Sequence, residues 1–156
     1  MGKWRDLVAA EQEVARRRAE VNQLPSRAEV LANAMSSSSV WDRATALTFL
    51  RLFPEDVPNL LEALVDMCLS TGWAQAASEA IRAARRDIDS AQLTEIVERH
   101  LSSGDAEDYL RLASMLTDCE AWESLGMLIE RAFESNDPEI REVAHDFTES
   151  HGRKLP

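Results

Sequence analysis

Histidine and cysteine, the residue types that most often carry chemistry in proteins, are few in this chain and widely spaced. The 156-residue sequence holds three histidines, His100, His145 and His151, and two cysteines, Cys68 and Cys119. None of them forms a His-x-x-x-His, His-Glu-x-x-His or Cys-x-x-Cys pattern, the spacings that bind metal ions or support thiol chemistry. We therefore predict no metal site, and we interpret both cysteines as small buried apolar groups in a reducing compartment.

Carboxylates are abundant, and their abundance itself weakens any assignment of a catalytic pair. The chain has 28 Asp and Glu residues, so close pairs arise by chance and do not by themselves indicate general acid–base catalysis. A glycine-rich phosphate loop and a Gly-x-Ser-x-Gly nucleophile elbow are both absent. The sequence therefore predicts no catalytic residues and no cofactor, and hence a protein that is not an enzyme.

The distribution of charge indicates the class of partner. The net charge of −11 divides into +1 for residues 1–35, with six basic and five acidic side chains, and −12 for residues 36–156, with eleven and twenty-three. Such an acidic field repels nucleic acid and anionic membranes and attracts basic proteins. We expect a basic protein partner, no nucleic acid and no membrane; the alternative is that the acidity serves solubility alone. No signal peptide and no apolar run of ~18 residues is present, so we expect a cytoplasmic protein.

The first 35 residues are predicted to form a helical appendage. A long amphipathic helix is expected from Lys3 to about Leu24, because apolar residues recur at spacings of three and four. These apolar residues are Trp4, Leu7, Val8, Val14, Ala15 and Val21. Pro25 ends this helix, and Ser26 followed by Glu29 has the spacing of a capping box for a second, shorter helix.

The apolar stripe of the first helix has two alternative explanations. The helix packs over the first repeat as a cap, which an array of repeats needs at its ends, or it pairs with another copy of the chain. In the second case the protein would be a self-assembling structural subunit. The residues of that self-association are Trp4, Leu7, Val14 and Val21. Both a monomer and a homodimer therefore stay open.

Residues 40–156 can be aligned with themselves in units of 32 or 33 residues. Four serines at residues 36–39 separate this part from the appendage and are typical of a short linker. The units are 40–72, 73–104 and 105–136, followed by a single closing helix at 137–151. The full units end on Gly72, Gly104 and Asn136, residues suited to the left-handed conformation that terminates helices.

Each full unit is interrupted near its middle, which predicts a hairpin of two helices. The interruptions lie at Pro54–Pro58, at residues 87–90 and at residues 117–120. One hairpin cannot bury its apolar face alone, whereas stacked hairpins can, so the repeat predicts an all-α array.

The closing helix begins with a pattern that resembles a HEAT-type repeat. Asp137 fits an N-cap and Pro138 the first helical residue. Arg141 and Ala144 follow at the HEAT spacing. The resemblance covers about residues 40–151 and implies a right-handed α-solenoid of antiparallel helix hairpins, with a period shorter than the 40–47 residues usual for HEAT repeats. The alternatives are another array of helix hairpins and an irregular bundle, since the tetratricopeptide and ankyrin signatures are absent.

Alignment of the second helices predicts which positions face inward. The expected core rows are Leu61, Leu93 and Leu125; Val65, Val97 and Ile129; and Leu69, Leu101 and Phe133. The expected outward rows are Asp66, Glu98 and Glu130, with Met67, Arg99 and Arg131 beside them. Trp41, Trp73 and Trp122 stand at or near helix starts, where we expect them to wedge between stacked hairpins or to anchor a partner.

The second helices of HEAT-type arrays line the concave face that usually binds partners, and the resemblance implies the same face here. The candidate partner-binding residues are Asp66, Glu98, Glu130, Glu62, Glu95, Glu123, Arg99, Arg131 and Trp122. The aligned acids would form a ladder that suits a basic helix or loop. The alternative is a solvated face with ordinary ion pairs, such as Glu95 with Arg99.

These observations favour a non-catalytic protein-binding module with an acidic concave face, acting as an adaptor or scaffold or as an immunity- or antitoxin-like protein. The structural subunit described above is the first alternative. A HEAT-like DNA repair enzyme is the second, but it needs a basic DNA-binding face. The net charge of −12 in residues 36–156 argues against that enzyme.

Overall fold

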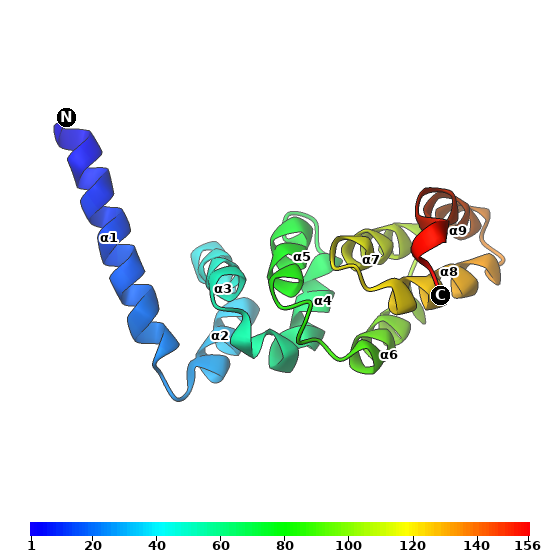
Figure 1. The fold of residues 1–156 in the computed structure, drawn as a ribbon, viewed down its shortest axis with the longest axis horizontal. Helices are drawn as coiled ribbons and strands as arrows, with labels where there is room; N and C mark the ends of the chain where they lie inside the picture. The colour runs from blue at the N-terminus through cyan, green and yellow to red at the C-terminus, as the bar shows by residue number, and fades with distance from the viewer.

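The computed structural model describes residues 1–156 as an all-helical chain, which confirms the predicted all-α class. The elements in chain order are α1 (Gly2–Asn22), α2 (Arg27–Ser36), α3 (Val40–Leu52), the 3₁₀ helix η1 (Pro54–Leu60), α4 (Leu61–Cys68), α5 (Ala74–Ala83), α6 (Ser90–Leu101), α7 (Ala106–Asp118), α8 (Trp122–Phe133), α9 (Pro138–His151) and the 3₁₀ helix η2 (Gly152–Lys154). Figure 1 shows them laid out from α1 at one end to α9 at the other. No helix has both the length and the apolar character that crossing a membrane requires.

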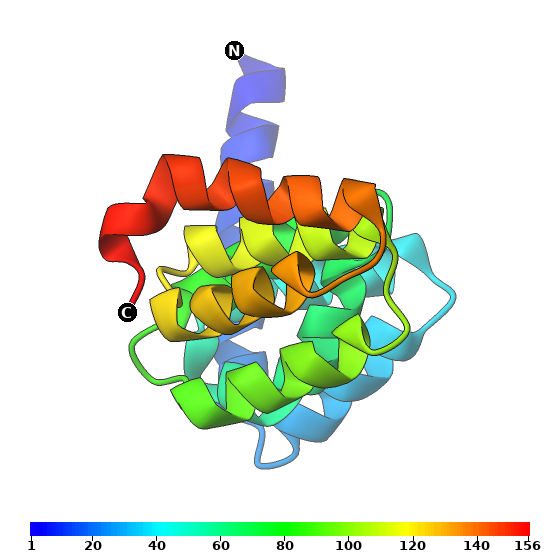
Figure 2. The same cartoon turned by 90° about the vertical axis from the view of Figure 1, so that its right-hand side faces the viewer.

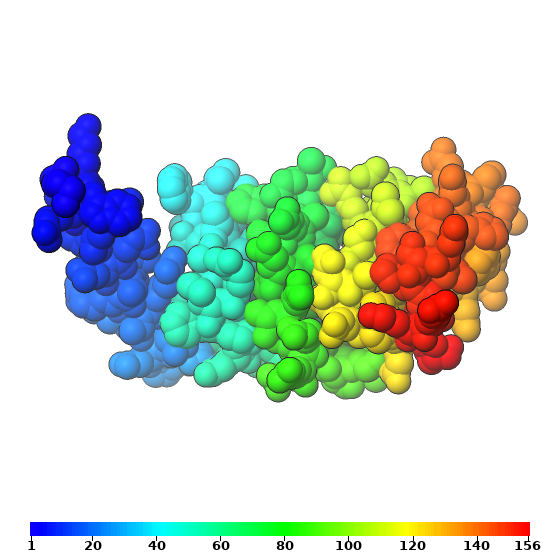
Figure 3. All heavy atoms as spheres, turned by 45° about the horizontal axis from the view of Figure 1, so that its top comes forward, coloured from blue at the N-terminus to red at the C-terminus, as the bar shows by residue number.

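Two rows of helices run along the body of the molecule. In the first row α3, α5, α7 and α9 each contact the next member, and α4, α6 and α8 form the second row in the same way. Contacts between the rows join α4 to α5, α6 to α7 and α7 to α8. Figure 2 looks along the rows from the end that carries α8 and α9, and Figure 3 shows successive parts of the chain following one another along the long axis. The order of the helices in space therefore follows their order in the sequence.

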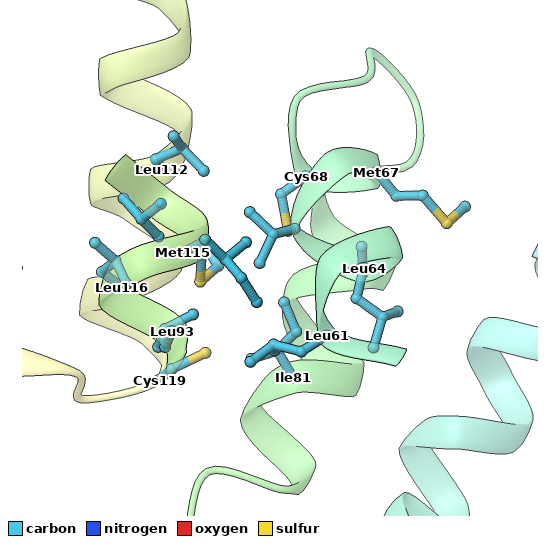
Figure 4. Packing of buried hydrophobic residues seen from close by; sticks show 14 of the residues in the cluster. Leu61, Leu64, Met67, Cys68, Ile81, Leu93, Leu112, Met115, Leu116 and Cys119 are labelled. Carbon is cyan, nitrogen blue, oxygen red and sulfur yellow. The ribbon is translucent and has the colours of Figure 1, made fainter. Parts of the chain in front are cut away.

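One apolar core joins the two rows. It contains 34 buried residues, from Leu31 in α2 to Ala144 in α9. Figure 4 shows its centre, where Cys68 of α4 points toward Met115 of α7. Two of the predicted core rows are confirmed, because all six of their residues are buried: Leu61, Leu93, Leu125, Val65, Val97 and Ile129.

Two predicted orientations are wrong. Met67, which the alignment places on an outward row, is buried in the core. Five of the eight residues of α4 are buried, because η1, α5, α6 and α7 all contact this short helix. Phe133, expected in the core, is 41 % exposed because it is the last residue of α8, and its ring packs edge-on against His145 of α9. In the same predicted row Leu101 is buried and Leu69 is half-buried.

The helix starts follow the sequence signals at most positions. The Ser39 hydroxyl accepts a hydrogen bond from the backbone N–H of Asp42, and the Asp137 carboxylate accepts one from Glu139. The capping box predicted at Ser26 is wrong, since its side chain makes no capping hydrogen bond. The backbone of Ser26, at φ −100° and ψ 20°, lies outside the extended region from which an N-cap side chain reaches the first turn.

Of the three residues predicted to end helices in the left-handed conformation, one does so and two do not. Gly72 has φ +92° and adopts the left-handed conformation expected of it. Gly104 and Asn136 do not adopt it, and each lies three residues beyond the last residue of its helix, Leu101 of α6 and Phe133 of α8. The left-handed residue between α7 and α8 is instead Glu120, with φ 56°, a residue type that does not signal this conformation.

The N-terminal helix α1 extends away from the body (Figure 1) and has no buried residue. The structure therefore does not place α1 over the first hairpin as the expected cap. Trp41, expected to wedge between hairpins, is 82 % exposed at the start of α3. Trp73 and Trp122 do pack against the core, each partly buried.

Candidate functional site

The acidic side chains singled out by the sequence all lie exposed on the second row of helices. They are Glu62 and Asp66 on α4, Glu95 and Glu98 on α6, and Glu123 and Glu130 on α8. Since α6 contacts both α4 and α8, the three helices form one continuous surface. We call this surface, made by α4, α6 and α8, the second-helix face.

One basic side chain of α6, Arg99, neutralises part of the charge at the α4 end of this face. Arg99 forms an ion pair with Glu62 on α4 and lies 3.4 Å from the Glu95 carboxylate on its own helix. The His100 ring nitrogen Nε2 lies 3.6 Å from the Asp66 carboxylate. Two of the candidate acids, Glu62 and Glu95, are therefore paired within the chain, and the predicted Glu95–Arg99 pair is present.

Three acids of α6 and α8, Glu98, Glu123 and Glu130, have no basic partner. Glu98 and Glu130 form no ion pair, and Glu123 accepts a hydrogen bond of 2.8 Å from the Ser90 hydroxyl. Arg131, half-buried, reaches the Ser102 hydroxyl at 3.4 Å rather than a carboxylate. Of the candidate acids, Glu98 and Glu130 are thus the two best able to receive a cation from outside.

Net charge alone does not distinguish the second-helix face from the other row. Helices α4, α6 and α8 carry six acidic and two basic side chains, a net charge of −4. Helices α3, α5, α7 and α9 also sum to −4, but their charges run from +1 through 0 and −2 to −3 along the row. What is particular to the second-helix face is that every helix in it is net negative and carries an exposed acid at the aligned position.

Other residues of the chain already contact the ring of Trp122, a residue predicted to bind a partner. Its ring lies at the start of α8, half-buried, with the Lys154 ammonium 5.2 Å from its centre and the His151 ring 5.9 Å away. The rest of its edge borders a hollow of about 300 Å³ beside Ser90 and Glu123. The chain's own C-terminal segment therefore occupies part of the aromatic surface that a partner would contact.

The histidines lie in separate places. His100 Nδ1 lies 2.9 Å from the Ile96 carbonyl oxygen, whereas His145 and His151 pack against aromatic rings. No group of three His, Cys, Asp or Glu side chains is placed to hold a metal ion.

The interpretation of the cysteines as buried groups is confirmed. Cys68 and Cys119 are both buried and unpaired with each other. Burial raises the pKa of each thiol to about 12, with the nearby Asp118 carboxylate adding to the effect. Both thiols are therefore neutral, weak nucleophiles at physiological pH.

The residues predicted for self-association lie along α1. Trp4, Leu7 and Val14 are 63 %, 51 % and 40 % exposed, and Val21 is half-buried where α1 meets the body. The structure adds Trp41 of α3, which sequence reasoning assigned to hairpin packing. The signal that could have marked Trp41 is its place one residue into a helix that follows a serine linker, with no preceding hairpin to cover it.

Between α1, α2 and α3 lies a groove of about 630 Å³, visible in Figure 3 beside the N-terminal segment. We call it the N-terminal groove. Its walls include Val14, Arg18 and Val21 of α1, Val30 of α2 and Trp41 of α3. It is mainly apolar and is separate from the second-helix face. Comparison of the chain with family models, curated proteins and solved structures finds no match to any of them.

Proposed function

We propose that this chain is a non-catalytic protein-binding module whose second-helix face binds a basic segment of a partner protein. The observation that carries the proposal is the pair Glu98 and Glu130, which are exposed on adjoining helices and form no ion pair within the chain. A partner's Lys or Arg can approach them without displacing an internal ion pair. Complementary charge of this kind mainly speeds encounter and sets specificity.

The finer fold assignment belongs to the same proposal. We infer a right-handed, HEAT-like α-solenoid of antiparallel helix hairpins. The two rows of helices, the contacts between successive members and the units of 32 or 33 residues support this arrangement. In such an array the second helices form the surface that faces a partner, and the partner's segment would cross α6 and α8.

The class of partner follows from the same residues. An extended or helical basic segment can follow a line of acids, whereas an anionic nucleic acid would be repelled by it. An adaptor or scaffold, or an immunity- or antitoxin-like protein that masks a basic surface, would act in this way. A reducing compartment such as the cytoplasm suits the two free cysteines.

The test compares two triple charge reversals. In the first, Asp66, Glu98 and Glu130 are replaced by Lys; in the matched control, Glu139, Glu142 and Glu149 of α9 are replaced by Lys. All six acids are exposed, so the net charge changes equally in both variants. Proteins captured from native lysate by the unaltered chain are identified by mass spectrometry, and the binding of the purified partner to each variant is then measured.

We expect the first variant to lose binding by about two orders of magnitude or more and the control to change it little, because close like charges cost several kcal/mol. The affinity of the unaltered chain should also fall with rising salt. Equal losses in both variants would show a general charge effect, and an unchanged affinity of the first variant would refute the proposed face.

A further inference from the structure

One side of α1 carries a regular seam. Its positions are separated alternately by three and four residues, which is the spacing at which two helices pack along each other. They are Trp4, Leu7, Glu11, Val14, Arg18 and Val21. Four of the six are apolar, none is buried, and the helix is 21 residues long. Helices in proteins gain most of their stability by packing an amphipathic face against other elements, so a seam without a partner is unexpected.

The N-terminal groove lies directly beside this seam. Val14, Arg18 and Val21 belong both to the seam and to the groove wall, and Val30 and Trp41 form the opposite side. Val30 is 44 % exposed and Trp41 is 82 % exposed. A helix laid along the seam would therefore also cover the exposed side chains of α2 and α3.

The two charged seam positions have no partner within the chain. Glu13 and Glu20 bind Arg16 and Arg17 in four exposed ion pairs. Glu11 and Arg18 form none, although both lie on the seam. They are seven residues apart, two turns of helix, which is too far for them to pair with each other.

This charge pattern distinguishes the two directions in which a second α1 could lie. In a parallel pair, Glu11 would face Glu11 and Arg18 would face Arg18, and like charges in a seam are repulsive. In an antiparallel pair that aligns the seams, Trp4 lies opposite Val21 and Arg18 lies opposite Leu7. The Glu11 of one helix is then about 6 Å along the axis from the Arg18 of the other, within reach of its long side chain.

We propose that the N-terminal groove binds the α1 helix of a second copy of this chain, antiparallel, to form a symmetric dimer joined by two reciprocal Glu11–Arg18 ion pairs. Trp4 of each copy then packs near Val21 of the other, where the groove opens toward Trp41. The same patch serves both copies, as a two-fold axis requires. This surface is distinct from the second-helix face, so the dimer and the proposed partner binding are independent.

The first test exchanges the seam charges. We measure the dimer dissociation constant by sedimentation equilibrium for the unaltered chain, for Glu11→Arg and for Arg18→Glu. Each single reversal places like charges at both symmetric contacts and should weaken the dimer by about tenfold or more. Neither residue makes an ion pair within the chain, so the fold is unaffected; circular dichroism checks this.

Mixing the two variants tests the charge pairing, and comparison with the unaltered chain gives the direction. In a parallel pair the single reversals would leave like charges facing each other as before, and the mixture would dimerise more tightly than the unaltered chain. The Glu11→Arg chain presents arginine at both charged seam positions, and the Arg18→Glu chain presents glutamate at both. In an antiparallel heterodimer of the two, each contact therefore joins an arginine to a glutamate and is favourable again. The mixture should dimerise about as tightly as the unaltered chain. A matched control, Glu62→Arg mixed with Arg99→Glu on the second-helix face, should leave dimerisation unchanged in every combination.

The second test locates the contact by cross-linking. Leu7→Cys and Arg18→Cys are prepared separately and oxidised alone and as a mixture; the buried Cys68 and Cys119 do not compete. An antiparallel pair predicts a disulfide between the two variants, whereas Leu7→Cys alone stays unlinked because its two copies are about 16 Å apart along the axis. A monomer at all concentrations, failure of the mixed variants to restore the dimer, or ready self-linking of Leu7→Cys would each overturn the proposal.

Discussion

Residues 1–41 expose most of their large apolar side chains, whereas residues 42–156 bury most of theirs. Nine of the twelve large apolar side chains that are exposed lie within residues 1–41. All but two of the 34 core residues, Leu31 and Met35, lie beyond residue 41. Both regions are helical and have amphipathic patterns. The difference shows that an amphipathic helix is buried only where the chain supplies a neighbour, and the repeat supplies one for every helix from α3 onward.

The largest expected effect separates the two regions directly. Leu64→Ala in α4 removes a side chain that is 0 % exposed and should lower the free energy of unfolding by about 3 kcal/mol, through lost burial and a residual cavity. Leu7→Ala in α1 should leave that free energy unchanged when measured at a protein concentration low enough for the monomer. Urea unfolding followed by circular dichroism measures both. A Leu7→Ala loss as large as that of Leu64→Ala would mean that α1 belongs to the folded body.

The second prediction concerns the two cysteines buried in the core of residues 42–156, and a pH titration tests it. Burial raises the pKa of Cys68 and Cys119 to about 12, above their ordinary value of 9.0. The neutral buried thiols contribute fully to the free energy of unfolding at pH values below the pKa that they have in the unfolded chain. This contribution is lost as the pH rises above that value, because the thiols of the unfolded chain ionise before those of the folded protein. We expect the two thiols together to reduce the free energy of unfolding by roughly 3 kcal/mol at pH 10 relative to pH 7.

The control for this titration is the double variant Cys68→Ala and Cys119→Ala. It should lose most of the decline in the free energy of unfolding above pH 9, while other groups titrate as before.

Thiol reactivity gives a separate test. The cysteine of a Trp41→Cys variant, at an exposed position, should react quickly with Ellman's reagent at pH 8, whereas Cys68 and Cys119 stay protected. Rapid reaction of Cys68 in the folded protein would contradict the packing described above.

The junction between the two regions should show a smaller effect. Arg27 at the start of α2 binds the Asp56 carboxylate at 2.6 Å and the Glu55 carboxylate at 2.8 Å, which fastens α2 to η1. Asp56 is buried, whereas Glu55 is exposed. We expect Asp56→Asn to lower the melting temperature by a few degrees and Glu55→Gln to have little effect, because solvent screens the outer pair. Equal shifts in the two variants would mean that burial does not set the strength of this junction.

The smallest effect is expected on α1 itself. Arg16 and Arg17 each bind Glu13 and Glu20 in exposed ion pairs. Glu13→Gln should leave the global unfolding midpoint unchanged while amide hydrogen exchange in α1 becomes faster, because the pairs stabilise only that helix. A shift of the global midpoint would show that α1 unfolds together with the body.

Much of the fold could be predicted because the relevant signals are local or repeated. The Ser39 and Asp137 caps, the Gly72 terminator and two of the core rows all follow from residue types at a fixed spacing. The errors have a common origin in tertiary packing. Met67 is buried because four elements surround α4, and Glu120 takes the left-handed conformation that a Gly would have signalled.

The sequence could predict which helices carry the candidate acids, but not which of these acids form ion pairs within the chain. The sequence alignment placed Glu98 and Glu130 on one surface, and the structure shows both exposed there. The sequence alignment could not show that Arg99 forms an ion pair with Glu62, because the two residues are 37 positions apart in the chain. The exposure of Trp41 was unpredictable for the same reason, since it depends on where α1 points.

The correspondence between chain order and spatial order bears on how the molecule reaches its native state. Helices of the body meet mainly their neighbours in the sequence, so only short loops need to close as contacts form. Proteins with such local topology fold within microseconds to milliseconds. In the helix-hairpin array that we propose, order can spread in both directions from any pair of neighbouring hairpins. Such an array can begin to fold once two successive hairpins have emerged from the ribosome, because one hairpin alone cannot bury its apolar face.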